Sequence, residues 1–382
     1  MRRAFVAAAM AALAALVAPA SALAQPVGLS PVAFSELKGW ARDDHAAAFA
    51  TFSASCRAIR DDLPPSRPAL PPSAALKAVC EHALALDEQD AAAARAFFER
   101  EFRAYRVGTG TLTGYYEPEI EGSREKTARF DTPLMARPAD LVMFAEGETA
   151  PGVPPGLGAA RRRPDGGLEA YPERAKIEDG ALAGRGLELV WTEPVDAFFV
   201  HIQGSTRVRL PDGTALRLAY DGRNGQKFTG IGRLLVERGA LTKSGTTMAS
   251  IRTWLAQNPR EGRDLMRENA SYIFFRIDGS LKETDGPRGA QNVPLTPGRS
   301  IAVDRTLWSY GLPFWIEGRF PDGERIEKLV VAQDTGSAIL GAARGDYFVG
   351  TGDAAGAVAG GMKQQTGFVA LLPREAGAGE AK

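Results

Sequence analysis

Apolar residues recur at helical spacing through the first quarter of the chain. The pattern predicts helices within 34–60 and 74–106, and the second of these segments is rich in alanine, the strongest helix former. The pattern changes after GTGTLTGYYEP at 108–118, where short β-branched and aromatic runs are separated by Gly, Pro, Asp and Asn. Runs of this kind indicate strands joined by turns.

The remainder of the chain is expected to be rich in strands. The segment 196–225 predicts strands, with the Pro-Asp-Gly-Thr sequence at 211–214 as a hairpin turn. A helical pattern returns over 246–270, strands follow up to residue 373, and the small, polar tail at 374–382 is expected to be disordered. Because strands and helices do not alternate, a parallel doubly wound sheet is excluded. We expect a mainly β fold with flanking α-helices.

The N-terminus has the composition of a secretory signal peptide. Two arginines precede the apolar run AFVAAAMAALAALV, and the small residues Ala22 and Ala24 form a cleavage site. We interpret residues 1–24 as a cleaved signal. An uncleaved anchor helix is the less favoured alternative, because the run breaks at Pro19 and is short for a bilayer. No cysteine follows the cleavage site, so no lipid anchor is indicated. The mature chain is expected in the periplasm, with outer-membrane association as an alternative.

The charge balance and the cysteine content limit the partners and metal sites that can be expected. Lys and Arg total 46 and Asp and Glu total 46, so no basic surplus favours a nucleic-acid partner. The two cysteines, Cys56 and Cys80, predict a disulfide in an oxidising compartment, with two buried free thiols as the alternative. The chain has three histidines and no paired-cysteine spacing, so a structural zinc site is not indicated. No other cofactor is expected.

Histidine-based and phosphate-binding sites find little support. A nucleophile of the Ser-His-Asp type needs a histidine held by hydrogen bonds, but His45 and His82 fall in the helical N-terminal region. His201 alternates with Phe199 on an expected strand, so we interpret it as a half-buried strand residue. The glycine-rich GTGTLTG precedes strand-like sequence, and no helix N-terminus is available there to hold a phosphate.

Carboxylates remain as the candidate catalytic groups. Asp334 in VVAQDTGSAI ends an apolar strand, and Asp346 in RGDYFVGTG precedes an aromatic pair. Burial and a second carboxylate both raise a carboxyl pKa, and an aspartate that stays protonated near neutral pH can act as a general acid. The alternative, a turn aspartate that caps backbone N–H groups, stays open for both and is preferred for Asp353. The surrounding glycines suit close approach of an extended ligand such as a glycan chain.

Several segments together resemble one known family. The sequences TGYYEP, HIQGSTRVRL, YDGRNGQKFTGIGRLLVERG and SYIFFRI are similar to the membrane-bound lytic murein transglycosylase A family. So is a C-terminal module that contains Asp304 in AVDRTLWSYGLPFWIE, followed by Asp334 and Asp346. The resemblance runs from Gly110 to Pro373. The chain departs from the family in lacking a lipobox cysteine, which bears on membrane attachment and not on chemistry.

The resemblance implies a fold, a reaction and a site. The fold is a double-psi β-barrel domain formed by 25–116 and 241–373, a smaller β-barrel inserted at 117–240, and a substrate groove between them. The implied reaction cleaves the β-1,4 bond between N-acetylmuramic acid and N-acetylglucosamine in peptidoglycan and leaves a 1,6-anhydromuramoyl end. Acid-base catalysis falls on Asp346, with Asp334 as its supporting neighbour. Peptidoglycan glycan strands are the implied partner, and other cell-wall enzymes are candidate partners.

Two alternative functions stay open. One is a non-catalytic peptidoglycan-binding protein on the same fold. The other is a water-using glucanase, which would need a second carboxylate, and Glu117 is the strongest candidate for it. For glycan binding we expect polar contacts from Gln203, Ser205 and Asn224, and stacking of Tyr116 against a sugar ring.

Overall fold

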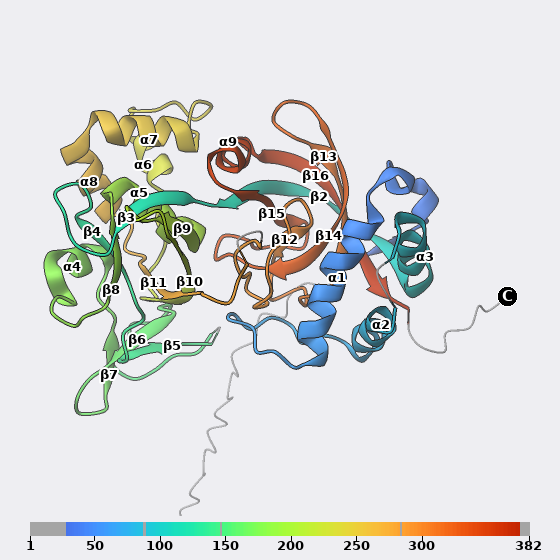
Figure 1. The fold of residues 1–382 in the computed structure, drawn as a ribbon, viewed down its shortest axis with the longest axis horizontal. Coiled ribbons are helices and arrows are strands. Elements are labelled where there is room, and N and C mark those ends of the chain that lie inside the picture. Colours follow the sequence, from blue (N-terminus) through green and yellow to red (C-terminus); the bar gives the residue numbers. More distant parts are fainter. Residues whose placement is uncertain (1–27, 87–88, 146, 283–284, 375–382) are drawn as a thin grey trace, which may run out of the picture.

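The computed structural model describes residues 28–86, 89–145, 147–282 and 285–374. Two domains lie side by side (Figure 1), one formed from both ends of the described chain and the other from its middle. The expected signal peptide lies outside the described residues, as does the expected tail beyond residue 374.

The first domain is built on a closed barrel. Six strands follow one another in the order β2-β15-β12-β14-β13-β16, and β16 pairs back to β2 to close the ring. Two neighbouring pairs, β2 with β15 and β12 with β14, are parallel, and the other pairs are antiparallel. The bounds are β2 Phe102–Glu117, β12 Ser300–Val303, β13 Pro313–Arg319, β14 Arg325–Asp334, β15 Arg344–Thr351 and β16 Lys363–Pro373. A short strand, β1 (Ser30–Val32), pairs with β2 outside the ring. The expected barrel is therefore confirmed.

Three helices cover one side of this barrel, namely α1 (His45–Arg60), α2 (Ala74–Leu84) and α3 (Ala91–Glu101). Each begins where a side chain of Asp or Ser accepts a hydrogen bond from the backbone N–H three residues further on, which stabilises the first turn. Their apolar faces join the barrel core through a cluster of phenylalanines that includes Phe52 and Phe98. A disulfide bond joins Cys56 of α1 to Cys80 of α2. The turns Phe34–Glu36 and Trp40–Arg42 precede α1 as 3-10 helices.

The second domain contains a six-stranded sheet in the order β11-β10-β9-β3-β8-β4. A bridge between Ala136 and Phe275 connects the two ends of this sheet, so the strands curl around an apolar core. The bounds are β3 Glu119–Ser123, β4 Thr132–Met135, β8 Glu188–Thr192, β9 Ser205–Arg209, β10 Ala215–Arg223 and β11 Ile273–Ile277. A separate three-stranded sheet consists of β5 (Leu141–Met143), β6 (Ala159–Arg162) and β7 (Leu168–Ala170).

The prediction of strands at 196–203 is wrong, because this segment is helix α5 (Pro194–Gln203). Pro194 occupies the first turn, and Gly204, with φ of +88°, ends the helix in the left-handed conformation. The apolar run between them is short, and short apolar runs do not distinguish a strand from a buried helix. His201 is therefore a helix residue.

The second domain also extends further along the chain than the expected boundary at residue 240. Three helices, α6 (Ile231–Glu237), α7 (Met248–Gln257) and α8 (Pro259–Arg267), pack with α5 around a common apolar cluster. Strand β11 then completes the second sheet beside β10. The helical pattern after 240 thus belongs to the inserted domain, which spans 119–277. Shorter helical turns lie at α4 (Arg174–Lys176) and Ile177–Ala181. No helix in the described ranges is long and apolar enough to cross a membrane.

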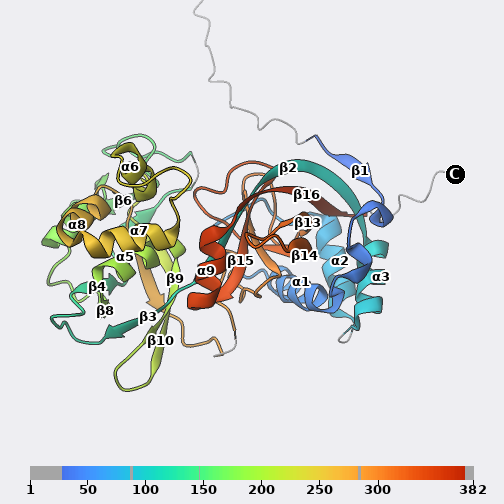
Figure 2. The same cartoon turned by 90° about the horizontal axis from the view of Figure 1, so that it is seen from above.

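Strand β2 runs out of the barrel toward the second domain (Figure 2), and its end is held by a buried ion pair. Glu117, at the end of β2, lies 3.1 Å from Arg217 Nε of β10. Thr351 at the end of β15 donates a hydrogen bond of 3.0 Å to the same carboxylate. Burial raises the pKa of Glu117, and the guanidinium of Arg217 opposes that shift. These contacts link the two domains at the point where the chain crosses between them.

A second buried ion pair anchors the N-terminal segment on the barrel. Asp43 precedes α1, and Arg299 precedes β12. The two guanidinium NH2 groups of Arg299 lie 2.7 and 2.9 Å from the two carboxylate oxygens of Asp43. Asp43 also accepts a hydrogen bond from the backbone N–H of Leu329. Both side chains of the ion pair are at most 6% exposed.

We expect Asp43→Ala to lower the free energy of unfolding by about 3–5 kcal/mol, because it leaves a buried guanidinium without a counter-charge. Urea unfolding monitored by circular dichroism measures this loss. Glu237→Gln is the matched control, since it removes the carboxylate of an ion pair whose two side chains are more than half exposed. Such pairs contribute about 0–1 kcal/mol. Equal losses in the two variants would contradict the anchoring role of Asp43.

Candidate active site

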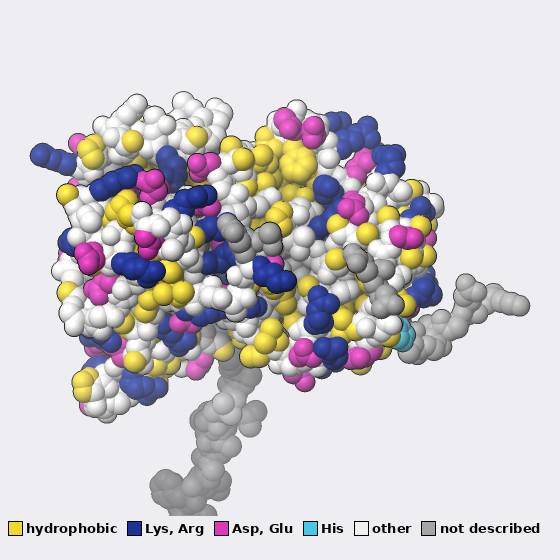
Figure 3. Space-filling model, in the orientation of Figure 1, with side chains coloured by type: hydrophobic (Ala, Val, Ile, Leu, Met, Phe, Trp, Pro, Cys, Tyr) yellow, Lys and Arg dark blue, Asp and Glu magenta, His cyan; other side chains and the backbone are white. Residues whose placement is uncertain are grey.

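A cleft of about 930 Å³ lies between the two domains. One wall comes from the barrel domain and includes Tyr115, Ala302 and Asp334. The other wall comes from the inserted domain and includes residues of the α5–β9 junction and of β10. Lys and Arg side chains, drawn dark blue, gather along the boundary between the two halves (Figure 3).

Asp346 lies on β15, with a short chain of hydrogen bonds beside it. The parallel register places it opposite Thr113 of β2, whose hydroxyl donates a hydrogen bond of 2.6 Å to the carboxylate. Arg344 Nη2 in turn donates to the Thr113 hydroxyl at 2.9 Å. The Asp346 side chain therefore has one direct hydrogen-bond donor among the described residues, and that donor is neutral.

Burial raises the pKa of Asp346 to about 6. The hydrogen bond from Thr113 and the positive charge of Arg344 oppose this shift, and the charge of Asp334 adds to it. A carboxyl group with this pKa is substantially protonated in weakly acidic solution and can still release its proton. It has the properties of a general acid that can later act as a base.

Asp334, the last residue of β14, accepts more hydrogen bonds than Asp346 does. Its Oδ1 accepts from the backbone N–H groups of Ala290 and Thr335, and its Oδ2 accepts from the Tyr115 hydroxyl, each at 2.8 Å. Burial raises the pKa of Asp334, but all three donors stabilise the charged form and oppose the shift. The pKa of Tyr115 is raised well above its usual value by burial and by both aspartates, so its hydroxyl stays a donor.

The two aspartates flank one residue of the sheet. Ala302 of β12 pairs with Asp346 on one side and with Asp334 on the other. Neighbouring strands lie about 4.8 Å apart, and the barrel is curved, so the two aspartate Cα atoms are at most about 10 Å apart. The structure therefore brings together the two aspartates that the sequence singled out. Asp334 and Ala302 line the cleft, whereas Asp346 lies next to this lining and is half-buried.

The other two aspartates of the C-terminal region have different surroundings. Asp304 is buried and accepts hydrogen bonds from the N–H and hydroxyl of Thr306 and from the N–H of Gly341. It therefore holds two loops at the cleft. Asp353 is exposed in the first turn of α9 (Asp353–Gly361), where its negative charge interacts favourably with the positive end of the helix dipole.

The expected glycan-binding residues fall into two groups. Gln203 and Ser205 line the cleft. Tyr116 is 6% exposed, and its hydroxyl lies 3.6 Å from Met248 Sδ, away from the cleft lining. Asn224 is fully buried, and its NH2 group donates to the carbonyls of Pro172 and Ala270. Its Oδ1 accepts from the N–H of Tyr272, so this amide is committed to the interior and does not support a glycan contact.

Sequence reasoning missed Thr113 and Tyr115. The alternation of side chains along β2 places these two residues on one face and Tyr116 on the other. This alternation was readable in TGYYEP, but only the pairing with β15 reveals which face meets the aspartates.

Two of the glycines near the aspartates serve packing. A Cβ atom at Gly345 would come within 2.6 Å of Ile301 in the barrel core, and one at Gly356 within 2.7 Å of the Tyr116 ring. These two positions face protein atoms, whereas Gly336 lines the cleft beside Asp334. In the part of the chain that the structure describes, no three His, Cys, Asp or Glu side chains gather as metal ligands.

Two family models match the chain. The MltA specific insert domain covers residues 111–276, and the 3D domain covers residues 299–372. The first match ends where the second sheet ends, and the second spans the barrel strands that carry the aspartates.

Whole proteins show the same similarity. Membrane-bound lytic murein transglycosylase A of Vibrio cholerae is 34% identical over 268 residues, which are 68% of this chain and 64% of that protein. A membrane-bound lytic murein transglycosylase from Agrobacterium tumefaciens has a similar crystal structure, with a TM-score of 0.82 and 37% identity over 91% of this chain and 98% of that chain. For MltA from Neisseria gonorrhoeae the TM-score is 0.77 and the identity 30%, over 91% and 93% of the two chains. The chain belongs to the membrane-bound lytic murein transglycosylase A family.

Proposed function

We propose that this protein is a peptidoglycan lytic transglycosylase that cleaves the β-1,4 bond between N-acetylmuramic acid and N-acetylglucosamine. Family membership supports the substrate class, because the relatives are named lytic murein transglycosylases. The cleft has a volume of about 930 Å³ and is lined by residues of both domains. The observation that carries the proposal is the half-buried carboxyl of Asp346, whose pKa is raised to about 6 beside this cleft.

One aspartate is sufficient for the proposed reaction. The protonated carboxyl of Asp346 donates its proton to the oxygen of the leaving sugar as the glycosidic bond breaks. The 6-hydroxyl of the muramoyl sugar then attacks its own C1, and the carboxylate of Asp346 accepts the proton of that hydroxyl. The product is a 1,6-anhydromuramoyl end, and Asp346 is again protonated. The water-using alternative would require a second carboxylate that activates water or attacks carbon.

Asp334 is suited to a positioning role. Its three hydrogen-bond donors fix the carboxylate and favour its charged form. A fixed negative charge near Asp346 adds to the rise in its pKa that burial causes. Asp334 therefore helps to keep the proton on Asp346 until the substrate is bound.

Glu117 does not support the glucanase alternative. Its side chain is fully buried, paired with Arg217 and hydrogen-bonded by Thr351. Moving it into the cleft would break the ion pair that links the domains, and separating a buried ion pair costs about 3–5 kcal/mol.

We expect Asp346→Asn to lower the rate of release of anhydromuropeptides from murein sacculi by two to four orders of magnitude, roughly the contribution of general acid-base catalysis. The amide retains the shape of the side chain but cannot exchange the proton. Chromatography and mass spectrometry of the released products measure the rate. Asp353→Asn is the matched control, since it makes the same change at an exposed position of the same region. An Asp346→Asn protein that is well folded and nearly as active as wild type would refute the assignment.

The value of kcat/KM should fall as the pH rises through about 6. The sign follows from the role of the group: the acid form of Asp346 is active in the first step, and it is lost above its pKa. Initial rates on solubilised glycan strands between pH 4 and 8 test this. A rate that rises through the same range would contradict a proton donor at Asp346.

We expect Thr113→Val to move the fall in kcat/KM to higher pH. The Thr113 hydroxyl donates to the carboxylate, which favours the charged form and lowers the pKa of Asp346. Valine has a similar shape but no donor, so the pKa of Asp346 should rise further. The same pH profile measures the shift, and a limb that moves to lower pH would show that another group titrates.

A further inference from the structure

The linker between α1 and α2 reaches from the N-terminal helices to the cleft. It spans residues 61–73 and contains five prolines, which fix φ and make it stiff. The disulfide bond between Cys56 and Cys80 joins the two helices, so the linker is part of a closed loop. Two of its residues, Ser66 and Arg67, line the cleft. The linker is therefore a constrained segment that contributes to the cleft wall.

The first contact of the linker with the candidate site runs through Ser66. Its backbone N–H donates to the carbonyl of Ala290 at 2.9 Å, and its hydroxyl donates to the same carbonyl at 3.3 Å. Ala290 in turn donates its own N–H to Asp334 Oδ1 at 2.8 Å. The linker thus supports a peptide group that holds the Asp334 carboxylate.

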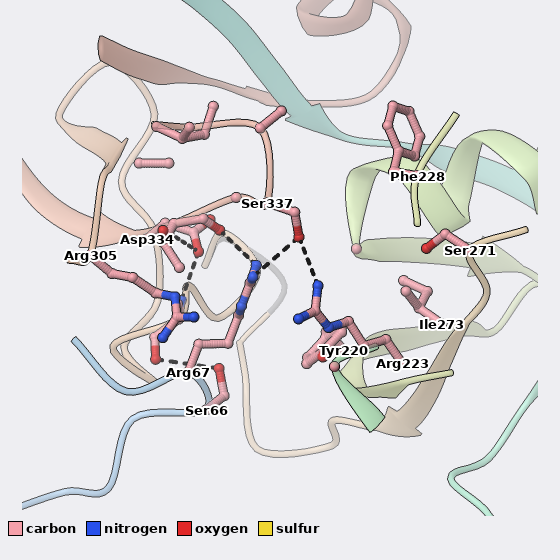
Figure 4. Close-up of a pocket in the computed structure, with 18 of the residues that line it drawn as sticks. Ser66, Arg67, Tyr220, Arg223, Phe228, Ser271, Ile273, Arg305, Asp334 and Ser337 are labelled. Atoms are coloured by element: carbon pink, nitrogen blue, oxygen red, sulfur yellow. Dashed lines mark hydrogen bonds between the residues drawn. The ribbon is translucent and has the colours of Figure 1, made fainter. Parts of the chain in front are cut away.

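Arg67 makes the second contact with the surroundings of Asp334. Its guanidinium group donates to the Thr335 carbonyl at 3.4 Å and to the Ser337 hydroxyl at 3.3 Å, both in the loop that follows Asp334. The Tyr310 hydroxyl donates to the Arg67 carbonyl at 3.0 Å, which holds the main chain of the linker. Figure 4 shows the guanidinium group of Arg67 directed at Ser337, next to Asp334. Both acceptors are neutral, so Arg67 brings a positive charge next to Asp334.

The charge of Arg67 favours the ionised form of Asp334. Burial raises the pKa of Asp334, and the charge of Arg67 opposes that rise together with the three hydrogen-bond donors to the carboxylate. The titratable groups around Asp334 are Tyr115, Tyr310 and Asp346. Burial and the charge of Asp334 raise the pKa of both tyrosines, so their hydroxyls stay neutral. Arg67 therefore offsets part of the cost of a buried negative charge at Asp334.

We propose that Arg67 is a positioning residue for the transglycosylase reaction, because it holds the loop after Asp334 and stabilises the negative charge of that carboxylate. This inference rests on the proposed function, in which the charge of Asp334 helps to keep the proton on Asp346. Arg67 acts through Asp334, whereas the pKa of Asp346 responds to Thr113, Arg344 and Asp334.

The pH profile of kcat/KM distinguishes this role from a purely structural one. The value of kcat/KM reports the ionisations of the free enzyme, and the active form has Asp334 charged and Asp346 protonated. Activity should therefore be lost at low pH as Asp334 takes up a proton, and at high pH as Asp346 releases its proton. Arg67→Gln removes a charge that lowers the pKa of Asp334, so the loss at low pH should begin at a higher pH.

We expect the ratio of Arg67→Gln to wild-type kcat/KM to be about threefold or more lower at pH 4 than at pH 6, since activity below such a pKa falls about tenfold per pH unit. The loss above pH 6, which reports Asp346, should move less. Arg67→Lys keeps the charge and should retain the wild-type profile at low pH. Arg233→Gln is the matched control, since Arg233 is exposed on α6 and paired with Glu237. Initial rates of anhydromuropeptide release from solubilised glycan strands measure these values.

A ratio that does not change with pH, or a loss at low pH that Arg67→Lys does not restore, would overturn the role of Arg67. Circular dichroism checks that the variants are folded. Arg67→Met, which also lacks the charge, replaces Arg67→Gln if that variant unfolds. If the wild-type protein releases no anhydromuropeptides, the proposed function fails instead.

Discussion

The parallel pairing of β2 with β15 is the constraint on which the site depends. This register sets Thr113 beside Asp346, Tyr115 beside Phe348 and Glu117 beside Thr351. A slip of one residue would turn the hydroxyl donors to the opposite face of the strand. Because β2 also closes the ring with β16, its register is fixed from both sides. The hydroxyl hydrogen bonds from Thr113 to Asp346 and from Tyr115 to Asp334, and the crossing to the inserted domain, therefore follow from one strand pairing.

The two aspartates lie in one site but differ in the number of hydrogen bonds that they accept from protein groups. Asp334 has three donors, two of them backbone N–H groups that cannot move away. Burial raises the pKa of both aspartates, and Asp346, whose pKa is raised to about 6, has a single side-chain donor that opposes the shift. The two carboxyl groups therefore differ in the number of donors that stabilise their charged form, as well as in how deeply they lie. This end of the barrel thus gives its two carboxyl groups different hydrogen-bond surroundings.

Much of this arrangement was accessible from sequence, where local pattern and chemistry agree. The helices of the N-terminal region, the strands around Asp334 and Asp346 and the apolar setting of those carboxyl groups could be predicted from periodicity and neighbours. The long-range pairing of strands could not be predicted from the sequence. It decides that Tyr115 and not Tyr116 reaches an aspartate, and that Asn224 saturates interior carbonyls. Helix α5 was missed because its apolar run suits a strand equally well until Gly204 ends it.

The insertion of one domain into the other has a consequence for the order of assembly. Thr113 and Asp346 are 233 residues apart in the chain. The partners of β2 in the barrel, β15 and β16, both follow the whole inserted domain in the sequence. Contacts this distant form late, because the entropy of closing a long loop opposes them until the intervening segment is compact. A folded inserted domain would shorten that loop. A nascent chain that has not yet delivered β14 and β15 has no assembled aspartate pair, so the candidate site forms only after both strands have been synthesised.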